Sequence, residues 1–248
     1  MRIYLAGDLW VTEGAGRLSG VSLPGRQGVL ALTYLIVERR HATTAGDLAE
    51  VLWPDEMPAA WDVGLRAILS KCRAAIASAG LTGAMRIERQ DGYRLVLRPD
   101  TWIDVEAAHV AMHEAEAAAS RGDARSAAGP AIGARAISER GFLPGFEGTW
   151  VEEQRARLED VRVRAIAVLA ETWLAHGDVP LALRDARELV RLQPYNEAAT
   201  RLLMKAQVAM GDHGAAAIAF ETLVQRLKHD LGVGPASETI AAFRALTV

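Results

Sequence analysis

The chain of 248 residues contains one cysteine, few aromatic residues and no long apolar run. The single cysteine, Cys72, cannot form an intramolecular disulfide, so the sequence favours a reducing compartment. The longest apolar stretch, Val29–Val37, is interrupted by Thr33 and has about half the length of a membrane span. The opening residues Met1–Trp10 lack the apolar core and the cleavage site of a signal peptide. We therefore expect a cytoplasmic protein without a membrane segment.

A large net charge is also missing, because the formal charge is −3 at pH 7. The charges are unevenly distributed along the chain. Residues 1–103 carry 12 Lys/Arg against 11 Asp/Glu, whereas residues 104–248 carry 16 against 20. Within Ala60–Arg98 the count is seven basic residues to three acidic ones. A local basic window can bind an anionic partner even when the whole chain is acidic.

The first hundred residues begin with strand patterns and continue with helical ones. Residues 1–22 alternate loosely between glycine-containing turns, including Gly14-Ala15-Gly16, which predicts a small antiparallel sheet. Apolar residues then recur at helical spacing from Val29 as far as Arg39-Arg40. Thr44 followed by Asp47 resembles a capping box, which opens a second, short helix. Both helices are expected to pack on a common core.

A third helix and a hairpin complete this first part. Helical spacing predicts a helix from about Ala59 to Ala79, with Gly80 ending it. Two alternating segments follow, and Asp91-Gly92 joins them as a hairpin turn. The order of sheet, three helices and hairpin is the one that a winged helix requires. We predict an α+β winged helix-turn-helix domain over residues 1–103.

Beyond Asp104 the strand signals disappear and alanine-rich helical patterns fill residues 104–248. Gly177-Asp178 and Gly211-Asp212 stand 34 residues apart, and so do Ala182 and Ala216. This interval is the tetratricopeptide period, in which small residues let paired helices approach closely. The pattern predicts an all-α, tetratricopeptide-like second domain.

Basic side chains on the third helix and the hairpin form the candidate DNA-binding site. An exposed helix fits the major groove of DNA, and an adjacent hairpin reaches the neighbouring backbone. On the helix, Arg66 and Ser70 are expected to face bases, while Lys71 and Arg73 face phosphates or bases. The hairpin side chains that would contact the backbone are Arg86, Arg89 and Arg94. For each arginine alone, a role as an ordinary solvated surface charge is as compatible with the sequence as contact with DNA is. The prediction therefore rests on their combination.

Other chemistry has weaker support in the sequence. His109 and His113 lie four residues apart on an expected helix, a spacing that could place two metal ligands on one face. Helices often carry such residues without a metal, so no metal or other cofactor is expected. Cys72 falls on the apolar side of the third helix, which favours a buried, unreactive thiol. No nucleophile with a base and no carboxylate cluster rises above chance, so we do not expect an enzyme.

Several segments resemble regulators of the SARP/AfsR type. They are Leu52-Trp53-Pro54-Asp55 and Leu69-Ser70-Lys71-Cys72-Arg73, the hairpin segment Asp91-Gly92-Tyr93-Arg94-Leu95, and the stretch Leu227–Thr239. That last stretch is similar to the signature that closes the bacterial transcriptional activation domain of this family. Together with Leu5-Ala6-Gly7 and Pro24-Gly25-Arg26-Gln27, these segments extend the resemblance over essentially the whole chain.

The resemblance implies an OmpR-like winged helix followed by a bacterial transcriptional activation domain over residues 104–248. It implies binding to double-stranded promoter DNA, commonly at direct repeats, where two copies could bind as a homodimer. It also implies activation through contacts with RNA polymerase and its sigma factor. Longer relatives carry further modules, whereas this chain has no Walker-type loop and is expected to be the short form.

One segment departs from the family pattern and keeps an alternative open. Such regulators often carry further basic and amide residues at the start of the third helix, where this chain has Ala60, Trp61, Asp62 and Val63. The alternative is an adaptor whose winged helix has lost strong DNA binding and serves as a protein-interaction surface. Asp62 and the weakly charged first domain favour the adaptor, whereas Arg66, Lys71, Arg73 and the basic hairpin oppose it.

Overall fold

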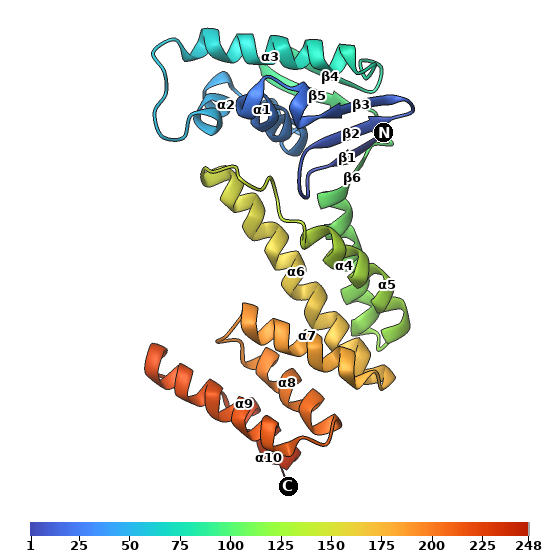
Figure 1. Ribbon diagram of the computed structural model, residues 1–248, viewed down its shortest axis with the longest axis vertical. Helices are drawn as coiled ribbons and strands as arrows, with labels where there is room; N and C mark the ends of the chain where they lie inside the picture. The colour runs from blue at the N-terminus through green and yellow to red at the C-terminus, as the bar shows by residue number, and fades with distance from the viewer. Residues whose placement is uncertain (248) are drawn as a thin grey trace. The chain divides into compact units, whose positions relative to one another are not determined.

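The computed structural model describes residues 1–247, which form a mostly helical chain with two small sheets (Figure 1). They divide into two compact units. The first unit comprises residues 1–107 and 137–159, and the second comprises residues 108–136 and those from 160 onward. The segment 137–159 therefore returns to the first unit, although it lies far along the chain.

A four-stranded sheet opens the first unit. The strands β1 (Arg2–Tyr4), β2 (Trp10–Glu13) and β3 (Gly16–Ser19) are antiparallel neighbours, as the sequence predicted. The short strand β6 (Trp102–Ile103) adds a parallel partner to β1, giving the order β3-β2-β1-β6. Alternate side chains enter the core, because successive residues of a strand point to opposite faces. The inward set is Ile3, Val11, Leu18 and Ile103, all nearly or fully buried.

Three helices follow this sheet and match the predicted positions closely. They are α1 (Gly25–Val37), α2 (Ala45–Leu52) and α3 (Trp61–Ser78). The predicted capping box is present, because Asp47 N–H donates to Thr44 Oγ1 at 3.1 Å and Thr44 N–H donates to Asp47 Oδ2 at 3.2 Å. A short 3-10 turn, η1 (Gly20–Ser22), joins the sheet to α1.

The predicted hairpin consists of β4 (Met85–Gln90) and β5 (Gly92–Leu97), which pair without a bulge. Its tip is fixed to the loop between α1 and α2, where Thr43 and Tyr93 exchange backbone hydrogen bonds of 2.8 and 2.7 Å. Gly92 makes this close approach possible. Its φ is +142°, and a Cβ at this position would lie 2.5 Å from the carbonyl oxygen of Thr43. Any other residue would be strained here and would push the hairpin from the loop.

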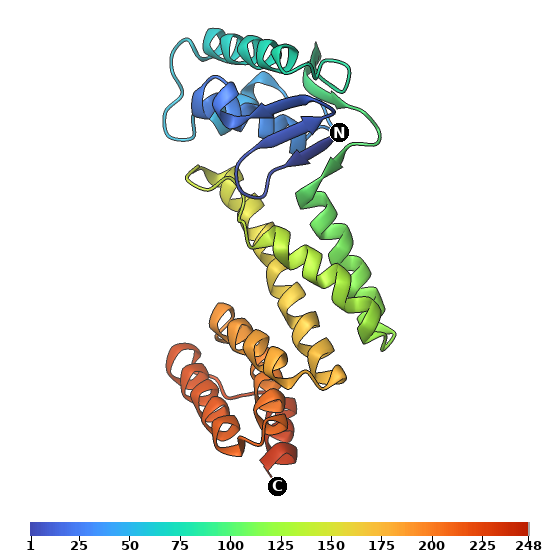
Figure 2. The same cartoon turned by 45° about the vertical axis from the view of Figure 1, so that its right-hand side comes forward.

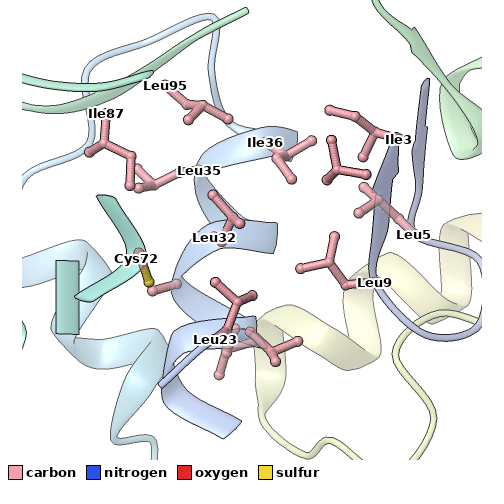
Figure 3. Close-up of a cluster of buried hydrophobic side chains, with 14 of the residues drawn as sticks. Ile3, Leu5, Leu9, Leu23, Leu32, Leu35, Ile36, Cys72, Ile87 and Leu95 are labelled. Atoms are coloured by element: carbon pink, nitrogen blue, oxygen red, sulfur yellow. The ribbon is translucent and has the colours of Figure 1, made fainter. Parts of the chain in front are cut away.

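One hydrophobic core joins the sheet, the helices and the hairpin of the first unit. Figure 3 shows Leu32 and Leu35 of α1 between two sets of side chains. Cys72 of α3 and Ile87 of β4 lie on one side, and the sheet lies on the other. Because α3 and the hairpin share this core, they are held as one body.

Asp104 fixes the start of α4 (Asp104–Ser120) to the sheet. Its buried carboxylate accepts hydrogen bonds from the backbone N–H groups of Leu5, Ala6 and Val105 at 2.8, 3.1 and 2.8 Å. The three donors offset part of the desolvation cost that an unpaired buried carboxylate would incur. Nearby, Gly7 N–H donates to the carbonyl of Gly141 at 2.7 Å, which ties the returning segment to the same edge.

The second unit is all helical. It is built from the remaining parts of α4, α5 (Ala124–Ser138) and α6 (Thr149–His176), and from the helices that follow. Those are α7 (Val179–Leu192), α8 (Glu197–Ala209), α9 (His213–Arg226), the π turn η2 (Leu227–Leu231) and α10 (Ser237–Thr247). Figure 2 shows α7, α8 and α9 packed in succession, in agreement with their contacts.

The two predicted repeats occupy corresponding places in this unit. Gly177-Asp178 joins α6 to α7, and Gly211-Asp212 joins α8 to α9, with glycine φ values of +81° and +80°. Ala182 and Ala216 are both fully buried, so neighbouring helices can approach closely at both positions. The 34-residue interval therefore reflects two helix pairs with the same local construction.

The closing signature stretch has a structural role in packing α10 onto α8. Gly232 adopts a left-handed conformation at the end of η2, which redirects the chain. Glu197 then accepts a hydrogen bond from Ala236 N–H at 2.8 Å, and Arg201 donates to Thr239 Oγ1 at 2.9 Å. Both acceptor and donor come from α8, so this stretch fixes the final helix of the described chain.

Candidate nucleic-acid interface

The helix α3 presents a polar flank beside its buried face. Its core side chains are Leu65, Ile68, Leu69, Cys72 and Ile76. Arg66 and Ser70 are exposed, and Arg73 is half-buried. With 3.6 residues per turn, these three polar residues fall within an arc of about 60° around the helix axis. The fold thus gathers three of the predicted site residues on one flank.

Lys71 does not lie on this flank. It is displaced from Arg66 by roughly 140° around the helix axis. Its neighbours are Arg17 of β3, Ser22 of η1 and Ser78 of α3, with which it lines an open hollow of about 420 Å³. The helical turn therefore separates Lys71 from Arg66, although the two residues are close along the chain.

Arg66 has an acidic partner on the same helix. Its guanidinium forms an ion pair with the Asp62 carboxylate, one helical turn earlier, and its Nε donates to the Asp62 carbonyl at 3.1 Å. Both side chains are about half exposed, at 53% and 54%. Exposed pairs of this kind contribute little free energy, so another acceptor that can take two hydrogen bonds from a guanidinium can compete with Asp62 for Arg66. The four-residue spacing was the signal for this pair in the sequence.

Arg73 links α3 to the hairpin. Its Nε donates to the carbonyl oxygen of Ile87 in β4 at 3.1 Å, and its side chain is half-buried. Replacing Arg73 would therefore loosen the hairpin as well as remove a charge. Arg66 is the cleaner position at which to test contact with a ligand.

The hairpin arginines divide between two faces. The strand register places Arg86 and Arg94 on the outer face, together with Glu88. Arg86 Nε donates to Glu88 Oε1 at 2.6 Å, and Arg94 Nε donates to the carbonyl of Arg39 at 3.3 Å. Arg89 lies on the other face, near the tip, where its guanidinium carbon is 5.9 Å from the centre of the Tyr93 ring. Both Arg86 and Arg94 are exposed on this outer face.

Two basic residues that sequence reasoning assigned only to a helix end lie beside the hairpin. Arg39 and Arg40 line an open hollow of about 270 Å³ with Arg94 and Arg98. The Arg39 guanidinium donates two hydrogen bonds to the Glu106 carboxylate, of 2.5 and 2.8 Å. Arg40 is exposed and extends the basic surface of the hairpin. Their adjacency in the sequence was the available signal.

The thiol of Cys72 and the possible metal ligands were the other candidate groups in the sequence. Cys72 is buried, and desolvation raises the pKa of its thiol to about 12. Its Sγ lies 3.7 Å from the carbonyl oxygen of Gly28. The expectation of a buried, unreactive thiol agrees with this environment. Among residues 1–247, no group of three or more His, Cys, Asp or Glu side chains could hold a metal ion.

Within residues 1–247, no helix is long and apolar enough to cross a bilayer.

Comparison with known proteins gives consistent matches. The family model for the bacterial transcriptional activator domain matches residues 103–247. The regulatory protein AfsR of Streptomyces coelicolor is 24% identical over 220 residues, and that of Streptomyces griseus is 25% identical over 243 residues. These alignments cover 89% and 96% of this chain but only 22% and 24% of those proteins. The chain thus spans about a quarter of the AfsR relatives.

A shorter relative and a solved structure extend the comparison. The transcriptional regulatory protein MoaR1 of Mycobacterium tuberculosis is 25% identical over 227 residues, which cover 90% of this chain and 72% of that protein. A structure of Mycobacterium tuberculosis EmbR in complex with a low-affinity phosphopeptide shares the fold, with a TM-score of 0.82 at 20% identity. It covers 99% of this chain and 64% of the EmbR chain. The chain therefore belongs to the bacterial transcriptional activator domain family, and it is similar to regulators of the SARP/AfsR type.

Proposed function

We propose that this regulator binds double-stranded promoter DNA through a winged helix formed by residues 1–103. The observation that carries the proposal is the union of α3 with the β4–β5 hairpin. They share one core, and Arg73 bonds to the backbone of β4. A helix and a hairpin held as one body can enter the major groove and touch the adjacent backbone at the same time.

In this proposal α3 reads sequence and the hairpin acts as the wing. Arg66 leaves Asp62 to donate two hydrogen bonds to a guanine edge, and Ser70 contacts a neighbouring base. Arg73 and Lys71 bind phosphates on their respective flanks, and Arg86, Arg89 and Arg94 hold the backbone. Because phosphate contacts release counterions, binding weakens steeply as salt rises.

For residues 104–248 we propose a tetratricopeptide-like activation domain. The two corresponding helix pairs and the matched family model support it. By family resemblance, this domain contacts RNA polymerase and its sigma factor, and two copies bind repeated DNA sites as a homodimer. Its setting is then the cytoplasm, where promoter DNA is available.

Selection from a random duplex library by the purified protein tests the DNA-binding proposal. The enriched sequence is labelled and titrated by fluorescence anisotropy at two salt concentrations, with wild-type protein and Arg66→Ala. We expect an enriched motif, salt-sensitive binding, and a loss of about 10- to 100-fold for the variant, the value of one bidentate base contact. No enrichment from the library would contradict the proposal.

The ion pair between Asp62 and Arg66 favours a second candidate, an adaptor with weak DNA affinity. In that case Arg66 stays with Asp62, and the winged helix binds proteins instead. The same titration separates the two functions, because the adaptor predicts weak, salt-sensitive binding without preference among sequences.

A further inference from the structure

Arg17 and Lys71 differ from the other cations around α3 in having no partner. Arg66, Arg73, Arg86 and Arg94 each donate to a carboxylate or a backbone carbonyl. Within residues 1–247, neither the Arg17 side chain nor the Lys71 side chain forms a hydrogen bond, an ion pair or a ring contact. Both are exposed and line the same open hollow. Two unpaired positive charges in one hollow favour an anionic ligand.

This hollow lies on the opposite flank of α3 from the hairpin. Arg73 marks the hairpin flank through its bond to Ile87, whereas Lys71 is roughly 160° from Arg73 around the helix axis. Ala67 and Ala74 are exposed and lie between these flanks. The helix therefore carries cations on both sides of its outward face. A helix in the major groove lies between two phosphate backbones, so cations on both of its flanks can each contact one backbone.

The position of Arg17 is fixed by the turn that precedes it. Gly16 packs so closely on the end of α3 that a Cβ there would lie 2.6 Å from the carbonyl oxygen of Ala79. The β2–β3 turn is thereby held against the helix. The two cations thus project from elements that cannot move apart without losing this contact, which lowers the ordering cost of binding a ligand.

No acidic residue is among the described residues that line this hollow. Glu13, the acidic residue of β2, forms ion pairs with the N-terminal ammonium at 2.6 Å and with Arg98 at 2.7 Å. Two backbone carbonyls near the end of α3 accept hydrogen bonds from Gly80 and Leu81 N–H groups, which moderates the negative end of the helix dipole. The hollow also has the hydroxyls of Ser22 and Ser78, which can donate to phosphate oxygens.

We infer that Arg17 and Lys71 form a second phosphate-binding site, which holds the DNA strand on the side of α3 away from the hairpin. The inference rests on the proposed DNA binding and adds the β2–β3 turn to the DNA-contacting surface. These contacts supply affinity without sequence preference, because phosphates are the same at every base pair. Binding on both flanks would fix how far α3 enters the groove.

The test compares Arg17→Ala, Lys71→Ala and their double variant with wild-type protein on the enriched duplex. The logarithm of affinity is plotted against the logarithm of salt concentration. Each phosphate contact contributes about 0.9 to the slope, so the double variant should lose nearly two. The enriched motif should stay the same when the library selection is repeated with this variant.

A matched control removes the same charge elsewhere. Arg125 and Lys205 are exposed residues of the second unit, so Arg125→Ala/Lys205→Ala lowers the net charge equally. Its slope should remain that of the wild type. An unchanged slope and affinity in Arg17→Ala/Lys71→Ala, or a changed motif, would overturn the second phosphate site. Failure of the wild-type protein to bind any duplex would instead overturn the proposed function itself.

Discussion

Arginine side chains serve opposite purposes in the two units. Around α3 they form exposed bonds that a ligand could replace, as between Arg66 and Asp62. In the second unit, Arg135 and Arg162 instead form partly buried ion pairs between helices. Asp185 is fully buried and accepts from Arg135 at 2.8 Å, from Trp173 Nε1 at 3.1 Å and from Arg184 at 2.8 Å. The position of a charge, rather than the charge count of each unit, decides what it can bind.

Partly buried ion pairs connect the helices of the second unit to one another. Glu188 of α7 accepts from Arg135 of α5 at 2.6 Å and from Arg162 of α6 at 2.7 Å. A second set joins Arg164 of α6 to Glu116 of α4, with contacts of 2.7 and 2.5 Å. These pairs are arranged between helices whose alanine-rich faces offer little apolar area.

The largest effect expected from this comparison follows from removing the centre of the buried network. Asp185→Ala removes the buried carboxylate that accepts from Arg135 and from the Trp173 N–H, while Arg135 keeps its bond to Glu188. Loss of one partner of a buried ion pair costs about 3–5 kcal/mol, so the free energy of unfolding of the second unit should fall by this amount. Urea denaturation followed by circular dichroism measures it.

Arg184 provides the control for that change. It binds the same carboxylate from the surface, with its own side chain 58% exposed. Arg184→Ala should lower stability by no more than about 1 kcal/mol. Equal losses for the two variants would show that burial does not distinguish the charges as we describe.

The hairpin gives the next effect. Gly92→Ala forces a side chain into a conformation that L residues rarely adopt, against the carbonyl of Thr43. We expect the first unit to lose about 1–3 kcal/mol of stability and the hairpin to detach from its loop. Gly83→Ala, in the turn before β4, meets no atom within 4 Å and is the matched control. Unchanged unfolding of Gly92→Ala would contradict the packing of the hairpin tip.

Arg66 and Asp62 should change ligand binding while leaving stability nearly constant. On the proposed function, Arg66→Ala weakens binding to the enriched DNA, whereas Asp62→Asn strengthens it because the competing carboxylate is gone. Thermal unfolding of both variants should shift stability by about 0.5 kcal/mol or less, as for other exposed positions. Tighter DNA binding by Arg66→Ala, or unchanged DNA binding by Asp62→Asn, would contradict the idea that Asp62 and DNA compete for the Arg66 guanidinium.

The smallest effect concerns the pH dependence set by Asp104. Burial raises the pKa of its carboxyl above the ordinary value of 3.8, although hydrogen bonds from Leu5, Ala6 and Val105 act in the opposite direction. Because the folded protein then holds this proton more tightly, the associated stability is present below pH 3.8 and is lost as pH rises through the raised pKa.

Asp104→Asn removes that titration and loses an acceptor for Ala6 N–H. The wild-type protein should be more stable than the variant by about 1 kcal/mol at low pH, the value of one hydrogen bond. The difference should narrow as pH rises above 4, when unfolding is measured at several pH values. A difference that widens instead would show that the pKa of Asp104 is lowered by folding.

Local patterns in the sequence predicted the elements that depend on neighbouring residues. The capping box of Thr44 and Asp47, the turn at Asp91-Gly92 and the buried face of α3 were all evident, because each follows from short-range spacing. The parallel strand β6 was not, because its two residues pair with β1 a hundred positions earlier. The return of residues 137–159 to the first unit depends on equally distant contacts.

Side-chain environment limited the prediction of the site in the same way. The sequence indicated which cations lie on α3 and the hairpin, but not that Arg73 would be held by a carbonyl of β4. It predicted that Lys71 contacts phosphates or bases, but not that Lys71 shares a hollow with Arg17. Partners distant along the chain decide which charges stay available, and a single sequence does not reveal those partners.

The most direct test of DNA recognition by α3 is an anisotropy titration of the library-selected duplex with wild-type protein and Arg66→Ala. Our account predicts tight, salt-sensitive binding by the wild type and a loss of about 10- to 100-fold in the variant, with folding intact. Equal affinities of the two proteins for the selected duplex would contradict the account, because they would show that α3 does not read this DNA through Arg66.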